Sequence, residues 1–444
     1  MIRVAVPRPL TEARKSYNLD GIVRKKPMPA FIRNYAFVLT GNGLAGVLSF
    51  LISIILSRVL PLEDFGVFSL FFAILTLVWL LPSFIDSSYV RYARAAEPGE
   101  AEAYLRVNLI FKARAAVLLA ALSPFAGIAL GRWILAGKIP PLIVAMAVVG
   151  GACLAFLTSI IADFQVRGQF ARYSLGNISF YVLVLALLSV LSVRGRVSSL
   201  TVSAVFLAAA VLSGGAAFLV LSRRIGRLLP LDGEAASRML ALGRWILATG
   251  LLFIFIQRLD MFFVGLFLSP ADVGIYAAAS RLLSILTVFI GAASAILLPK
   301  AAVAVRTAAT ERAYWKDAGI LVGIILAVVV ILAASSPLIV AFFFGGKYAG
   351  AAKAVRVLFI GQVPQILALP AVYFLYGLED TFSIFAAMAA CFVVNVAANA
   401  ALTPRIGIVG PGWAYGAGYS VYLAVITAAF FRHRKKRGVA ERSG

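Results

Sequence analysis

Three ionisable residues lie inside stretches of the sequence that are otherwise almost wholly apolar. The segment FIFIQRLDMFFVG (253–265) contains Gln257, Arg258 and Asp260, and Arg281 lies in the next apolar run. A guanidinium group presents a planar fork of donors that matches the oxygens of a phosphate. Two arginines and one aspartate leave about one cation in excess, which hydrocarbon does not tolerate without water or an anion. These residues indicate a site for an anionic ligand.

Helical geometry restricts which of these residues can pair. Arg258 and Asp260 are two positions apart, about 200° round a helix, so they do not share a face. Both lie near the end of one apolar run and Arg281 lies early in the next, so the three have similar depths. We therefore expect an ion pair between Asp260 and Arg281, with Arg258, Gln257 or both facing a cavity. The alternative is structural: the pair pins two helices together, and Arg258 reaches a carbonyl oxygen.

Other polar residues within apolar runs are candidates for lining a path for a hydroxyl-rich solute. Gln362 and Gln365 are three positions apart, and Asn395 and Asn399 are four apart, so each pair shares one face of a helix. Asn42 is a further candidate in the first apolar run. For each residue taken alone, a hydrogen bond between packed helices is the alternative explanation.

Two carboxylates, Asp86 and Asp260, lie within apolar runs and are candidates for binding a coupling proton or cation. For Asp86, a buried neutral carboxyl is an equal alternative. The single histidine, His433, lies in the basic C-terminal segment, and the two cysteines, Cys153 and Cys391, lie within apolar runs. We therefore expect no catalytic residues, no metal site and no cofactor.

The composition shows what kind of structure must hold these residues. Of the 444 residues, 62% are hydrophobic and 13% are charged, whereas globular chains carry roughly a quarter charged residues. The apolar runs are about 20 to 25 residues long, enough for a helix to cross the hydrocarbon core of a bilayer. They are apolar on every face, which excludes a β-barrel. The net charge of +23 is spread over tails and short loops, so we expect no nucleic-acid partner.

Charged residues, glycines and prolines divide the chain into twelve candidate membrane spans. An even number of spans puts both termini on one side of the membrane, and most lysines and arginines fall on that side, which is therefore cytoplasmic. The spans are 35–58, 66–90, 112–131, 140–163, 173–193, 199–222, 244–268, 273–298, 317–342, 354–377, 380–402 and 407–431.

A repeated motif indicates two related halves. The sequence LPLEDFGVF (60–68) matches LSPADVGIY (268–276) at an offset of 208, and each copy lies between the first two spans of a six-span half. In each copy, Pro and Asp are expected to start a helix and Gly to permit close approach. Because six is even, the halves are parallel repeats about an axis along the membrane normal. At this offset, Arg258, Asp260 and Arg281 correspond to Phe50, Ile52 and Ala73, so the fold itself does not demand the charges.

The predicted fold is thus an all-α polytopic membrane protein with about twelve helices in two six-helix lobes. The predicted parts are a basic cytoplasmic N-terminal tail, a first lobe, a cytoplasmic linker, a second lobe and a basic cytoplasmic C-terminal tail. Their ranges are 1–34, 35–222, 223–243, 244–431 and 432–444.

Four ordered motifs resemble a known family. They are SRVLPLEDFGVFSL (57–70), RLDMFFVGLFLSPADVGIYAAASRL (258–282), FFFGGKYAGAAKAVRVL (342–358) and TPRIGIVGPGWAYG (403–416). Together they resemble the polysaccharide and O-antigen lipid flippases of the multidrug/oligosaccharidyl-lipid/polysaccharide exporter superfamily, which includes the MATE transporters.

The resemblance implies a V-shaped pair of lobes that opens alternately to each side of the bacterial inner membrane. It implies a flippase that translocates a polyprenyl-pyrophosphate-linked oligosaccharide, with basic residues of the central cavity holding the pyrophosphate. Arg258 and Arg281 match that role, whereas the first lobe has no arginine in mid-span. Membrane lipids, a polysaccharide polymerase and export machinery are the implied partners.

Two other functions remain open at this point. An ion-coupled multidrug or metabolite antiporter has the same two lobes, but it favours an acidic cavity for cationic drugs, whereas the charge here is net positive. A polytopic glycosyltransferase or polymerase needs a sizeable external loop or paired acids, whereas the loops expected outside are short. Translocation breaks no covalent bond, so we do not expect an enzyme.

Overall fold

The structure is a computed structural model, and it describes residues 28–96, 98–193, 197–225, 233–305 and 307–443. These residues form helices and short turns, with no β-strand among them. Residues 1–27 of the predicted N-terminal tail and 226–232 of the predicted linker lie outside the described residues.

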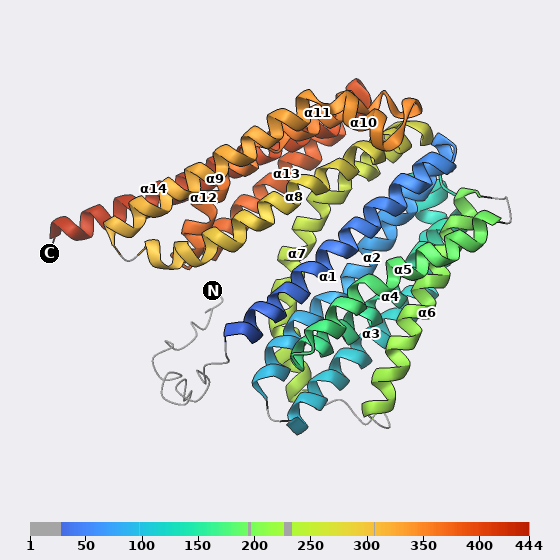
Figure 1. Cartoon of the computed structure of the whole chain (residues 1–444), viewed down its shortest axis with the longest axis horizontal. Helices are drawn as coiled ribbons and strands as arrows, with labels where there is room; N and C mark the ends of the chain where they lie inside the picture. Colours follow the sequence, from blue (N-terminus) through green and yellow to red (C-terminus); the bar gives the residue numbers. More distant parts are fainter. Residues whose placement is uncertain (1–27, 97, 194–196, 226–232, 306, 444) are drawn as a thin grey trace, which may run out of the picture.

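The helices form two bundles that meet at one end of the molecule and diverge toward the other (Figure 1). The first bundle, here called the first lobe, consists of α1 (Met28–Val59), α2 (Leu62–Ala95), α3 (Pro98–Ala126) with its π-helical extension η3 (Gly127–Ile134), α4 (Pro141–Val166), α5 (Phe170–Val193) and α6 (Ser199–Ile225). The start of α1 and the end of α14 both lie at the diverging end.

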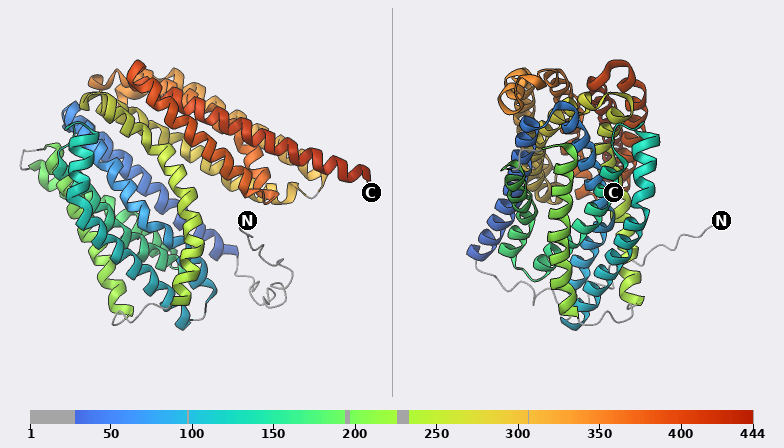
Figure 2. Two further views of the ribbon diagram at one scale, coloured as in Figure 1. Left: turned by 180° about the vertical axis from the view of Figure 1, so that it is seen from behind. Right: turned by 90° about the vertical axis from the view of Figure 1, so that its right-hand side faces the viewer.

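The second lobe follows the same plan with more interruptions. It consists of α7 (Gly233–Phe267), α8 (Pro270–Ala304), α9 (Ala308–Ala334), α10 (Ser336–Phe344), η4 (Gly346–Tyr348), α11 (Ala351–Gly361), α12 (Val363–Gly377), α13 (Thr381–Ile406), η5 (Gly407–Val409) and α14 (Gly410–Ser443). Helix α7 packs on α2 of the first lobe as well as on α13, so it lies between the two bundles (Figure 2).

Eleven segments of the described chain are long and apolar enough to cross a membrane. The last of them, Thr381–Arg434, contains both α13 and α14, which turn back on each other at η5 and pack side by side. The segment therefore holds two crossings, and the prediction of an all-α membrane protein with about twelve spans is confirmed. Helix α7 begins at Gly233, which lies inside the linker predicted for residues 223–243. The lobe boundaries predicted at residues 222 and 244 stay predictions.

The tenth predicted span is broken in the middle. Gln362 separates α11 from α12, and Pro364 lies in the first turn of α12, where its missing N–H costs no hydrogen bond. A Cβ atom at Gly361 would lie 2.4 Å from the carbonyl oxygen of Gly412 in α14, so only glycine allows the close approach next to the break. The break turns the polar start of α12 toward the interior of the second lobe.

The two copies of the repeated motif pack against each other where the lobes meet. A Cβ atom at Gly66 would lie 1.8 Å from the carbonyl oxygen of Pro270, and one at Gly274 would lie 2.4 Å from that of Leu62. These glycines therefore let α2 and α8 cross at backbone contact. In the second copy Ser269 and Asp272 form a capping box at the start of α8.

A pair of lysines ties the two lobes together at the same end. Lys138 donates hydrogen bonds to the carbonyl oxygens of Gly265 (3.0 Å) and Leu266 (2.8 Å) at the end of α7. Lys347 donates to the carbonyl oxygen of Leu60 (2.7 Å) just after α1. Each lobe therefore supplies a cation to the C-terminus of the first helix of the other lobe, where the helix dipole favours positive charge.

Candidate functional site

A cavity of about 300 Å³ lies between the two lobes. The first lobe contributes Ser49, Phe50 and other residues of α1 together with Tyr181 of α5. The second lobe contributes residues of α7, α8 and α14: Gln257, Arg258, Asp260, Met261, Ser280, Arg281, Leu283, Ser284, Thr287 and Tyr415. The structure thus brings the four polar residues of the two neighbouring apolar runs to one cavity.

The predicted ion pair between Asp260 and Arg281 is wrong. The Asp260 carboxylate is 3% exposed and accepts hydrogen bonds from the Tyr276 hydroxyl, the Met261 N–H (2.7 Å) and the Tyr415 hydroxyl (3.4 Å). Among the described residues it has no basic partner within salt-bridge distance. Tyrosine hydroxyls satisfy the carboxylate without neutralising its charge by a cation.

Both guanidinium groups keep their donors available. Arg281 lies over the ring of Phe72 in the first lobe, 4.6 Å from the ring centroid, which is a cation–π contact across the lobes. Arg258 is half-buried and also lines the cavity. Within the described part of the chain, neither side chain forms a hydrogen bond or an ion pair with the protein. The arrangement is therefore suited to binding an anion with several oxygen atoms.

Gln257 lines a second cavity as well, which has a volume of about 570 Å³ and lies inside the second lobe. Gln362 and Gln365 also line it. The inter-lobe cavity therefore shares Gln257 with a second cavity, which lies between α7, α8, α12, α13 and α14.

The other predicted cavity residues lie elsewhere. Asn395 and Asn399 are buried within the packing of α13 on α14, where the Asn399 amide donates to the Asn395 side-chain oxygen (3.1 Å) and Thr403 donates to Asn399 (3.4 Å). They join neighbouring turns of α13 instead of facing a cavity. Asn42 is exposed on α1 and does not line the cavities described here. The polarity of these asparagines does not reveal whether the helix face that carries them points to a cavity or to a neighbouring helix.

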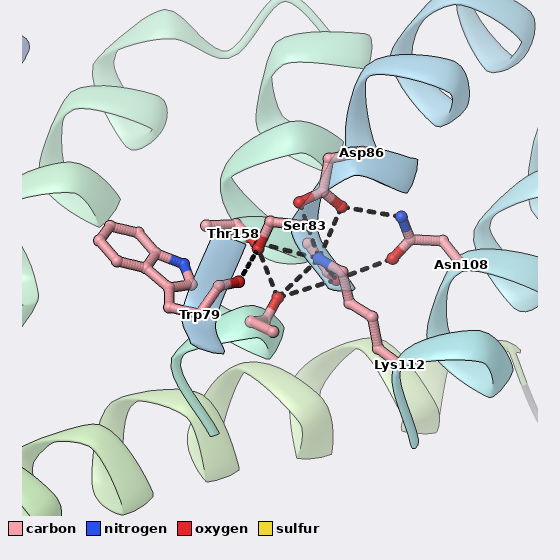
Figure 3. A network of polar contacts seen from close by, with 8 residues as sticks. Trp79, Ser83, Asp86, Asn108, Lys112 and Thr158 are labelled. Carbon is pink, nitrogen blue, oxygen red and sulfur yellow. Dashed lines mark hydrogen bonds and ion pairs between the residues drawn. The ribbon is translucent and has the colours of Figure 1, made fainter. Parts of the chain in front are cut away.

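Asp86 belongs to a buried polar network in the first lobe (Figure 3). The Lys112 Nζ atom lies 2.7 Å from both oxygens of the Asp86 carboxylate, and the Asn108 amide donates to one of them at 2.8 Å. Lys112 also reaches the Thr158 (2.9 Å) and Ser159 (2.8 Å) hydroxyls of α4. The ammonium group is fully buried. Asp86 is thus the partner of a lysine that links α2, α3 and α4.

Lys112 was not predicted to be a buried partner of Asp86, because the predicted third span (112–131) begins at this residue. Helix α3 begins at Pro98, well ahead of the predicted start of that span, so Lys112 lies in mid-helix. The signal that was available is the spacing of Asn108 and Lys112, four positions apart and so on one face.

Asp86 and Thr158 also line a cavity of about 510 Å³ within the first lobe. Tyr181 lines both this cavity and the inter-lobe cavity. Three adjoining cavities therefore run from one lobe to the other, and the two arginines lie in the middle one. Among the described residues, no group of three or more His, Cys, Asp or Glu side chains is placed to hold a metal ion.

The fold and these cavities define a multi-pass membrane protein built from two helical lobes around a cationic centre. A model of the family described as "polysaccharide biosynthesis protein" matches residues 31–302, more than half of the chain. The chain therefore belongs to this family, which confirms the resemblance seen in the sequence. No curated protein matches the chain in sequence.

Solved structures with the same fold belong to flippases and transporters. A structure of the lipid II flippase MurJ in an inward closed conformation aligns with a TM-score of 0.70 at 13% identity, covering 89% of this chain and 87% of that chain. An inward-facing multidrug resistance MATE family transporter of the MOP superfamily aligns at 0.69 with 18% identity, covering 94% and 99%. An outward-facing structure of such a transporter aligns at only 0.55, with 15% identity and coverage of 93% and 96%. At these identities the likeness establishes the fold.

Proposed function

We propose that the protein is a flippase that moves a polyprenyl-pyrophosphate-linked oligosaccharide across the bacterial inner membrane by alternating access. The observation that carries this proposal is the pair of arginines, Arg258 and Arg281, that face the inter-lobe cavity with no protein anion bound to them in the described chain. Family membership supports a role in polysaccharide synthesis, and the fold shared with MurJ supports translocation of a lipid-linked substrate.

The obstacle to such a substrate is electrostatic. A pyrophosphate and several hydroxyl groups must pass about 30 Å of hydrocarbon, in which an unpaired anion has a prohibitive cost. A cavity with two guanidinium groups supplies charge and donor geometry for the phosphates, while the lipid tail stays in the bilayer. Asp260 offsets only part of that charge: its hydrogen bonds are to tyrosines and a backbone N–H, and two guanidinium groups against one carboxylate leave a net positive charge at the cavity.

The conformation fits one stage of such a cycle. The lysines and arginines of the sequence favour cytoplasmic termini, and the described ends of α1 and α14 lie at the diverging end of the lobes (Figure 1). On this topology the cavities open toward the cytoplasm and the lobes are sealed on the outer side. The better alignment with inward-facing relatives supports the same assignment.

Transport by the full-length protein in liposomes tests the proposal. A labelled undecaprenyl-pyrophosphate-linked oligosaccharide is added, and its access to the far leaflet is followed. We expect Arg258→Ala and Arg281→Ala each to slow translocation about tenfold or more, since a hydrogen bond to a charged group contributes about 1.5–3 kcal/mol. Arg132→Ala, at an exposed position away from the cavity, is the matched control.

Three outcomes contradict the proposal. Wild-type rates in both cavity variants would remove the anion site. Exchange of a cationic dye for protons, without movement of the lipid, would identify an antiporter instead. Transfer of sugar to a new acceptor by the purified protein would identify a glycosyltransferase or polymerase.

A further inference from the structure

The cavity inside the second lobe holds unused hydrogen-bonding groups. Gln257, Gln362 and Gln365 line it, and within the described chain none of their side-chain amides has a hydrogen-bond partner. Gln362 is only 8% exposed, and buried amides are normally satisfied. The helix break between α11 and α12 fixes its position. These amides are therefore donors and acceptors held ready for a ligand.

The rest of the lining is mainly apolar and carries no charge. Tyr373 and Tyr376 lie with their ring centroids 6.3 Å apart, and Tyr422 reaches the cavity from α14. Most of the remaining wall is formed by leucine, isoleucine, valine and methionine side chains together with the hydroxyl residues Thr287 and Ser294, and no lining residue carries a formal charge. Such a surface offers flat apolar faces together with amide and hydroxyl groups. It matches a ring that has an apolar face and a rim of hydroxyl groups, which describes a sugar.

The cavity of the first lobe differs from that of the second lobe because it contains the Asp86 carboxylate and has fewer free amides: among the described residues, the Gln165 side chain and the Trp79 indole N–H have no hydrogen-bond partner there. Asp86 and Thr158 are bound to Lys112, and the Asn177 amide donates to the carbonyl oxygen of Tyr173 (3.2 Å). Much of its polar lining is thus already bound within the protein. Within the described chain, the cavity of the second lobe holds three glutamines with free side-chain amides and no charged residue, so a neutral hydroxyl-rich group gains more hydrogen bonds there.

We propose that the cavity of the second lobe binds the sugar attached directly to the pyrophosphate, and that this sugar is a neutral hexose or N-acetylhexosamine. The assignment rests on the proposed flippase function. Gln257 lines both cavities, so a phosphate held by Arg258 and Arg281 places the first sugar at the entrance of this one. A uronic acid is disfavoured, because its carboxylate would enter a wall without a cation.

Binding to the purified full chain in nanodiscs tests this assignment. The probes are undecaprenyl pyrophosphate and the same lipid carrying one galactose, glucose, N-acetylglucosamine or glucuronic acid. We expect at least one neutral sugar to tighten binding about tenfold over the lipid without sugar. Gln362→Leu and Gln365→Leu abolish that gain and leave the binding of the lipid without sugar unchanged, whereas Arg281→Ala weakens every probe. Gln165→Leu, at the first-lobe cavity, is the matched control.

The outcomes separate this inference from the proposed function. If no lipid binds to the wild-type protein, the flippase function fails, and the sugar site with it. If the lipids bind but no neutral sugar tightens binding, or the glucuronic acid lipid binds best, the sugar site alone is overturned. An equal loss in Gln165→Leu has the same consequence. The melting temperature of each variant shows whether it is folded. If Gln362→Leu does not fold, Gln365→Leu still tests the sugar site.

Discussion

The environment of Asp260 shows how a carboxylate is kept inside a membrane protein without a basic partner. Tyr276 and Tyr415 approach it from α8 and α14, and its own helix supplies the Met261 N–H. Tyr276 is fully buried. The three donors join α7, α8 and α14 at the floor of the inter-lobe cavity, so this carboxylate positions the helices that carry the arginines.

The two tyrosines are expected to contribute unequally. Tyr276→Phe removes the shorter hydrogen bond and leaves a buried charge with fewer donors, which destabilises the fold by about 1–3 kcal/mol. Tyr415→Phe removes a contact of 3.4 Å and is expected to have a smaller effect. Thermal unfolding of the two variants in detergent measures the difference. An equal or reversed order would contradict the assignment of Tyr276 as the main donor.

At the residue scale, the sequence predicted which residues meet but not how they pair. The depth of Arg258 and Arg281 along their helices follows from counting residues, and both lie on the inter-lobe cavity. The direction of a side chain round its helix does not follow from depth. Tyr276 and Arg281 are five positions apart, about 140° round α8, so a helix that presents Tyr276 to Asp260 turns Arg281 toward Phe72.

At the scale of helices, the Lys112 network holds three elements of the first lobe together. Lys112 comes from α3, Asp86 from α2, and Thr158 and Ser159 from α4 (Figure 3). A charge buried this deeply is stable only with its partner in place. The network therefore favours movement of the first lobe as one unit over sliding of its helices.

Replacing only one residue of this ion pair is expected to destabilise the protein more than replacing both. Lys112→Ala leaves the Asp86 carboxylate without its cation and destabilises the protein by about 3–5 kcal/mol. The double variant Asp86→Asn/Lys112→Met removes both charges and is expected to recover most of that loss. Melting temperatures of the two variants give the comparison. If the double variant is no more stable than the single variant, the uncompensated charge of Asp86 is not the main cause of the destabilisation.

The helices themselves were largely predictable, whereas their interruptions were not. Long apolar runs specify membrane helices, and α8 starts at the Pro and Asp of the motif at 268–276 as predicted, with Ser269 completing a cap that was not predicted. The first copy behaves differently: Asp64 accepts hydrogen bonds from Ser199 at the start of α6, and no side chain caps α2. Such a partner lies far away in sequence, so a local pattern does not reveal it.

At the scale of the whole molecule, Lys138 and Lys347 act as matching ties at the sealed end. Each binds carbonyl oxygens at the end of a helix of the other lobe. Separating the lobes at this end requires both sets of bonds to break. The ties therefore contribute to the preference for the conformation seen here.

Removing the ties is expected to shift the population toward a state in which the lobes separate at the end that is closed here. Spin labels at the exposed positions Trp133 and Leu338 report the separation of the lobes at this end. We expect Lys138→Ala/Lys347→Ala to increase the fraction with long distances several-fold, and each single variant to have a smaller effect. Arg132→Ala, a neighbouring exposed cation, should leave the distance distribution unchanged. An unaltered distribution in the double variant would mean that the ties do not set the equilibrium.

The backbone contact at Gly66 and Gly274 also fixes the mechanics of any rocking motion. Helices α2 and α8 touch there without intervening side chains. The contact lies near the start of each helix and can serve as the pivot about which the rest of both helices turns. From Gly66 to its end at Ala95, helix α2 rises over 29 residues, which at about 1.5 Å each gives an arm of about 44 Å. A turn of about 10° at this contact then moves the far end of such an arm by about 8 Å. A rotation that barely disturbs the glycine crossing is thus amplified into a change of aperture wide enough for a sugar ring to pass.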